Sequence, residues 1–141
     1  MPIVQKGVAA MSNHMPKVIS PKGHAIADYI TLGGLVALAA LFWKKNKRAA
    51  IAAATCAGAE ATNTLLTNFP GGVAKVISFP THGKIDMGLA ATCSAMPNFM
   101  GFDDEPEAKF FRIMGINITM VGALTDFRQP NVYRNRTRRA A

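Results

Sequence analysis

The stretch Gly23–Trp43, GHAIADYITLGGLVALAALFW, decides the fold predicted for this chain. It opens with His24 and Asp28 and then runs from Tyr29 to Trp43 without a charged residue. A membrane helix needs about 20 mostly apolar residues to cross about 30 Å of hydrocarbon. A helix of a soluble bundle would instead carry a charged face along its length. The stretch therefore predicts a membrane-spanning helix.

Three further apolar segments follow the first, within a chain of 141 residues that is about one domain long. The mean hydropathy of +0.16 is modest because polar, basic ends dilute the apolar middle. Pro97 interrupts the third segment and Arg112 the fourth. We predict an all-α, polytopic membrane protein with four transmembrane helices, at residues 24–43, 49–68, 83–102 and 108–127.

The His-x-x-x-Asp opening occurs twice, which indicates an internal repeat. Sliding the chain along itself until His24 meets His82 aligns 18–69 with 76–127 without a gap. Two crossings per copy would give both copies the same orientation, so we predict a tandem, parallel repeat of a two-helix hairpin. An N-terminal amphipathic or extended arm (1–22) and a basic C-terminal tail (129–141) flank a transmembrane domain at 23–128. The matched residues are His24/His82, Asp28/Asp86, Thr67/Thr125, Asn68/Asp126 and Phe69/Phe127.

The net charge of +8 could indicate nucleic-acid binding, but the positive residues lie beside the apolar segments. Such placement is typical of chains that contact anionic lipid headgroups in a bilayer, so we expect no nucleic acid. Ten Lys and Arg residues fall on the side of the termini and six on the other, which favours cytoplasmic termini. The tail residues expected to contact lipid or a partner are Arg134, Arg136, Arg138 and Arg139.

Four marks together resemble a known family. The His-x-x-x-Asp opening and the Leu-Thr-Asn/Asp-Phe ending occur in both copies, with Tyr29 after Asp28 and a Pro97-x-x-x-Gly101-Phe102 ending once each. Over about 18–128 the chain is similar to the small bacterial four-helix integral membrane proteins related to the SPW-repeat family. The resemblance implies a protein of the bacterial inner membrane, without an established activity and without catalytic residues to carry over.

The repeated polar residues form the first candidate site. His24 and Asp28 are four residues apart and so share a helical face, as do their mates. The helix ends should bring further polar groups to the same depth, which predicts a polar layer made of His24, His82, Asp28, Asp86, Thr67, Thr125 and Asp126. The layer could simply join the hairpin ends through hydrogen bonds. Alternatively, His24 and His82 could bind a haem, a chlorophyll or a quinone. The chain has no zinc-type ligand spacing, so no metal is predicted.

Glu60 is the second candidate, because it lies about 11 residues into the second apolar segment. A carboxylate at membrane depth indicates a functional site, here proton or ion conduction. The alternative is a neutral glutamic acid that hydrogen-bonds Asn117, Asn63 or Thr64.

Catalytic motifs are absent from the sequence: it has no nucleophile elbow, phosphate loop or zinc motif. We therefore expect a non-enzymatic protein that is a structural or accessory subunit of a membrane complex or a homo-oligomer. Cofactor binding at His24 and His82 and conduction through Glu60 stay as the alternatives.

Overall fold

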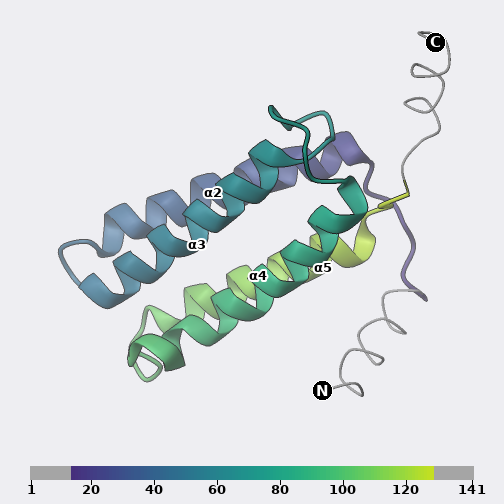
Figure 1. The fold of residues 1–141 in the computed structure, drawn as a ribbon. Helices are drawn as coiled ribbons and strands as arrows, with labels where there is room; N and C mark the ends of the chain where they lie inside the picture. The colour runs from purple at the N-terminus through teal and green to yellow at the C-terminus, as the bar shows by residue number, and fades with distance from the viewer. Residues whose placement is uncertain (1–13, 129–141) are drawn as a thin grey trace, which may run out of the picture.

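The computed structural model describes residues 14–128 (Figure 1). Over this range the chain is all-α, as predicted, and no strand is assigned in it. The four helices are α2 (Pro21–Phe42), α3 (Lys47–Leu66), α4 (Phe79–Met100) and α5 (Ala108–Leu124).

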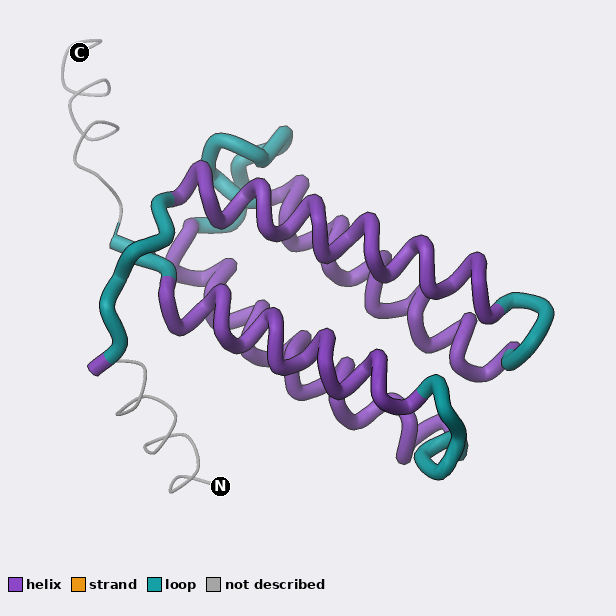
Figure 2. Tube along the Cα trace, turned by 180° about the vertical axis from the view of Figure 1, so that it is seen from behind, coloured by secondary structure: helices purple, strands orange, loops and turns teal. Residues whose placement is uncertain are grey.

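The helices form two antiparallel hairpins, α2 with α3 and α4 with α5, which lie side by side (Figures 1 and 2). Helix α3 packs against α4 and α2 contacts α5, so α2 and α4 face each other diagonally across the bundle. Both hairpin turns lie at one end of the molecule (Figure 1). The α3–α4 linker and the ends of the described chain lie at the other end, which we call the linker end.

Local sequence explains where the helices begin and end. Ser20 and Ser78 cap α2 and α4 by accepting hydrogen bonds from backbone amides, with a proline in the first turn of each helix. Gly101 ends α4 at a φ of 71°, a backbone conformation that favours glycine. Helix α4 begins and ends at the same offset from α2 that relates the two copies in the sequence.

The apolar character of the helices is uneven. Helix α2 has a mean hydropathy of 1.9 in its best window, and it is the one described helix long and apolar enough to cross a membrane by composition. The prediction of four such helices is therefore not supported by composition. Pro97 does not interrupt α4, which continues to Met100, because only the last turn follows this residue.

The interior changes along the bundle. At the turn end, aromatic and alanine side chains fill it, including Phe42, Ala53, Phe102 and Phe111. Helices α4 and α5 come so close that a side chain at Gly115 would collide with Ser94. At the linker end the interior is polar, and this layer is the candidate site.

Candidate metal centre

Four ionisable side chains converge on one point at the linker end of the bundle. Helix α2 supplies His24 and Asp28, and α4 supplies His82 and Asp86 from the diagonal position. All four residues are at most 4% exposed. One ligand atom from each lies within 4.8 Å of the others, so the set could hold a metal ion.

The distances are those of a compact donor set. The two Nε2 atoms are 3.0 Å apart, and each lies 3.0 Å from Oδ2 of Asp86. Asp28 completes the group, with Oδ1 at 3.3 Å from Nε2 of His24 and Oδ2 at 3.2 Å from Nε2 of His82. Each histidine thus faces both carboxylates.

Two threonines fix the proton positions on the histidines. The hydroxyl of Thr125 donates to the Val121 carbonyl at 2.6 Å, and that of Thr67 donates to the Asn63 carbonyl at 2.6 Å. Because each hydroxyl has one proton, its oxygen can only accept from the histidine beside it. The contacts from Nδ1 of His24 to Thr125, at 2.7 Å, and from Nδ1 of His82 to Thr67, at 2.8 Å, are therefore N–H donations.

This assignment leaves both Nε2 atoms without a proton in the neutral imidazoles. Two lone pairs and two carboxylates then point at the same buried volume. Each Nε2 atom lies 3.0–3.3 Å from the other Nε2 atom and from both carboxylates, and acceptors this close repel one another. Oδ2 of Asp28 shows this lack of hydrogen-bond donors, because it lies 3.2 Å from Nε2 of His82 but receives no hydrogen bond. The group therefore requires positive charge at its centre, from a metal ion or from added protons.

The donor separations match a tetrahedral ion. Zinc bonds to nitrogen and oxygen ligands of about 2.0–2.1 Å give edges of about 3.3–3.4 Å in a tetrahedron. The five separations that involve an Nε2 atom, 3.0–3.3 Å, lie just inside this value. Two axial histidines on opposite sides of a haem iron would instead need their nitrogens about 4 Å apart. Both Nδ1–H groups are already donated to threonines, so neither is free for a quinone.

The surroundings hold the donors in place. Asn63 donates to Oδ1 of Asp86 at 2.7 Å, which leaves Oδ2 directed at the histidines. Three phenylalanines, Phe69, Phe79 and Phe127, place their ring centroids 5.2–6.4 Å from that of His24. A polar network that fixes the ligands and an apolar shell that excludes water are the usual supports of a metal site.

The structure places some of the remaining predicted residues in the polar layer and others outside it. The structure brings Thr67 and Thr125 into the layer, but not Asp126. The prediction for Asp126 is wrong because the backbone becomes extended at Thr125, where α5 ends, and the next side chain lies outside the layer. Asp126 instead accepts two hydrogen bonds from the Arg128 guanidinium, at 2.8 Å each, and these lower its pKa to about 2. The predicted lipid contacts Arg134, Arg136, Arg138 and Arg139 lie outside the described residues.

Glu60 is buried, at 2% exposed, and its Oε2 atom has no hydrogen-bond partner. The predicted bond to Asn117 is wrong, because Asn117 donates to Thr31 on α2 at 3.3 Å. The physical reason is the packing order: α5 contacts α2 and α4, whereas α3, which carries Glu60, lies on the diagonal from it.

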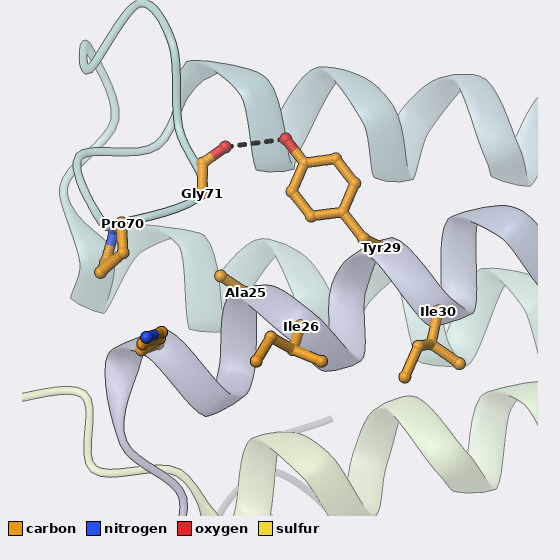
Figure 3. A pocket seen from close by; sticks show the side chains of 7 residues that line it. Ala25, Ile26, Tyr29, Ile30, Pro70 and Gly71 are labelled. Atoms are coloured by element: carbon orange, nitrogen blue, oxygen red, sulfur yellow. Dashed lines mark hydrogen bonds between the residues drawn. The ribbon is translucent and has the colours of Figure 1, made fainter.

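A separate hollow lies elsewhere on the described part of the molecule. It has a volume of about 460 Å³ and lies between α2 and the Pro70–Gly71 segment (Figure 3). Tyr29 closes one side by donating to the Gly71 carbonyl at 2.8 Å. Apolar side chains such as Ile26 and Ile30 dominate its lining, so it offers no comparable set of ligands.

The sequence grouped the histidines and aspartates correctly in space but did not predict a metal. Zinc motifs are recognised by closely spaced ligands, whereas here the two His-x-x-x-Asp pairs come from helices that are far apart in the sequence. The usable signal was the repetition of this pair. Comparison with protein-family models, curated proteins and solved structures found no match. The resemblance to the SPW-repeat family therefore stays a prediction, and the chemistry of the site rests on its own geometry.

Proposed function

We propose that this chain is a non-enzymatic membrane protein whose two hairpins are joined by one buried divalent metal ion. The ligands are His24, Asp28, His82 and Asp86, and Zn²⁺ suits their tetrahedral nitrogen and oxygen set best. One observation carries the proposal: both Nδ1–H groups are donated to threonines, so in the neutral imidazoles both Nε2 atoms are acceptors that face two carboxylates.

A structural ion fits this centre better than a catalytic one. Catalytic zinc sites keep one position open for water or substrate, whereas structural sites use four protein ligands. Here four side chains surround the point, all are buried, and phenylalanines cover it at the linker end. Because each hairpin supplies one histidine and one aspartate, the ion would hold the two hairpins together. This supports a scaffold or accessory role.

The distribution of polar and apolar residues supports the membrane part of the proposal. The ionisable residues of the centre and Glu60 are buried, while large apolar side chains lie outside on all four helices. Ile30 is 70% exposed on α2, Phe99 is 82% exposed on α4 and Ile116 is 63% exposed on α5. Apolar patches of this extent mark surfaces that contact lipid or protein, and ionisable groups in lipid face the bundle interior.

Conduction through Glu60 has less support. A proton or ion path would have to continue through the turn end, where Phe42, Phe102 and Phe111 fill the interior with apolar rings. A tetrapyrrole between His24 and His82 conflicts with their 3.0 Å separation.

Metal analysis of the full chain, purified in mild detergent, tests the proposal. We expect one Zn²⁺ per chain, and Co²⁺ in its place should give the visible absorption bands of a tetrahedral ion. His24→Ala should abolish both signals. His14→Ala is the matched control, because His14 is exposed and lies before the start of α2. A folded wild-type chain that binds neither ion would refute the metal centre.

Alkaline carbonate extraction of membranes from expressing cells tests the location. An integral membrane protein stays in the pellet, and recovery of the folded chain in the supernatant would refute that part of the proposal.

A further inference from the structure

Four buried side-chain oxygens in residues 14–128 have no hydrogen-bond partner: Asp28 Oδ2, Glu60 Oε2, Asn63 Oδ1 and Thr64 Oγ1. Buried polar atoms are nearly always paired, so each exception calls for an explanation. These four share two properties. They are all oxygens, and they all belong to the α2–α3 hairpin.

The four residues also lie at one level of the bundle. Glu60 shares a face of α3 with Asn63 and Thr64, three and four residues later. The part of α2 from Asp28 to its C-terminal end is nearly as long as the part of α3 from its N-terminal start to Glu60. Because the two antiparallel helices pack against each other and rise equally per residue, these positions lie at the same level.

Asn63 and Thr64 each leave a side-chain oxygen without a hydrogen-bond partner. The amide nitrogen of Asn63 donates to Asp86 at 2.7 Å and to the His82 carbonyl at 3.3 Å, so its Oδ1 atom remains as an acceptor. Thr55 and Thr62 on α3, and Thr67 at its C-terminal cap, each donate to the carbonyl four residues earlier. Thr64 makes no such bond, although it is 0% exposed.

We propose that these oxygens form a second cation position beside the first, for a hard divalent ion such as Mg²⁺ or Mn²⁺. Carboxylate, amide carbonyl and hydroxyl oxygens are the ligands such ions prefer, with water completing the shell. This inference rests on the proposed function, because the ion at the first position balances Asp28 and Asp86, whereas Glu60 keeps a buried oxygen without a partner. Asp28 would be shared between the two ions.

A route to this position is present. A hollow of about 370 Å³ lies on the outside of α3 and α4, and its lining includes Gly58, Thr62 and Asn63. Asn63 is the buried member of this lining, at 3% exposed, whereas Gly58 and Thr62 are exposed. An ion or water entering the hollow would therefore reach the proposed ligand Asn63 before any other.

Manganese is the probe for the test, because its electron paramagnetic resonance signal falls when the free ion binds. The full chain in detergent is first loaded with one equivalent of Zn²⁺ and then titrated with Mn²⁺, and zinc release is measured in parallel. We expect one Mn²⁺ bound per chain with no zinc released. Glu60→Gln should weaken Mn²⁺ binding at least tenfold while retaining the zinc, which also shows that the variant folds.

Thr64→Val should weaken Mn²⁺ binding less than Glu60→Gln does, because it removes a neutral ligand. Thr55→Val is its matched control. Thr55 is an exposed threonine on the same helix, and its replacement should not affect Mn²⁺ binding. Equal Mn²⁺ binding by wild type and Glu60→Gln, or binding only with loss of zinc, would overturn the second position. Glu60-dependent Mn²⁺ binding in a chain that takes up no zinc would refute the first centre and retain the second.

Discussion

The two ends of the bundle join the same two hairpins by opposite means. At the linker end the contact is made by buried polar groups, centred on His24 and His82, whose Nε2 atoms are 3.0 Å apart. At the turn end it is made by apolar side chains, with Phe102 and Phe111 fully buried. Polar contacts at this end include the ion pair between Arg48 and Glu105 at the surface.

The difference shows which end of the bundle determines the relative position of the two hairpins. Apolar packing fixes distance loosely, since any well-fitting set of rings and methyl groups serves. A tetrahedral donor set accepts only one relative position of α2 and α4, because each donor must lie about 2 Å from the ion. We infer that the linker end sets the register of the hairpins and the turn end adds packing energy. The predictions below test this division.

The largest effect is expected for His82→Ala. The variant leaves Asp28 and Asp86 facing each other without a cation, and breaking a buried charge pair costs about 3–5 kcal/mol. Unfolding in detergent, followed with and without EDTA, measures the change. EDTA should lower the midpoint of the wild type and leave that of the variant unchanged.

The matched control is again His14→Ala, which should retain the response of the wild type to EDTA. A wild-type midpoint that EDTA does not shift would show that metal contributes nothing to stability.

A smaller loss is expected for Phe111→Ala at the turn end. Removing a buried phenylalanine leaves a cavity and costs about 3 kcal/mol, the low end of the usual range, because lipid reduces the transfer term. The variant should still bind one zinc with the affinity of the wild type. Phe110→Ala, at a position 38% exposed in the native protein, is the control and should cost less. Loss of zinc in Phe111→Ala would show that the two ends are not independent.

The third prediction concerns the threonines that orient the histidines. Thr125→Val removes the acceptor for Nδ1–H of His24, and loss of such a partner weakens metal binding about 10–100-fold. Competition with a chromophoric chelator measures the affinity. Thr119→Val is the control, because the Thr119 hydroxyl donates to the Gly115 carbonyl within α5 and not to a histidine of the centre. Thr67→Val should match Thr125→Val, since it removes the equivalent bond to His82. Unchanged affinity in both would contradict the proton assignment.

Much of the fold followed from the sequence because its signals were local. Continuous apolar runs predicted four helices. The spacing of His24 and His82 predicted that they share a layer, since the repeat places both at the start of corresponding helices. Membrane insertion of all four helices stays a prediction, because only α2 is apolar enough by composition.

The proton positions in the site and the order of the helices could not be predicted, because they depend on contacts between segments that are far apart in the sequence. The proton positions on His24 and His82 follow from threonine hydroxyls at the ends of other helices. The pairing of Asn117 with Thr31 follows from which helices are neighbours and which are diagonal. Sequence periodicity gives the face of a helix but not the order of helices around the bundle.

The smallest effect is expected at Asp126, just beyond α5. The guanidinium of Arg128 lowers the Asp126 pKa from 3.8 to about 2, so the contact favours the folded state only while the carboxylate is charged. Its contribution is present above pH 3.8 and is lost as the pH falls through about 2. Asp126→Asn should therefore leave unfolding at neutral pH nearly unchanged, since exposed ion pairs contribute little. It should also flatten the acid limb of the stability curve between about pH 4 and 2. Protonation of the metal ligands would act in the same direction at low pH, so the comparison is made in EDTA-treated wild type and variant. An acid limb that is identical in the two would show that Asp126 and Arg128 do not hold the end of α5, and the stability of the linker end would then rest on its buried centre alone.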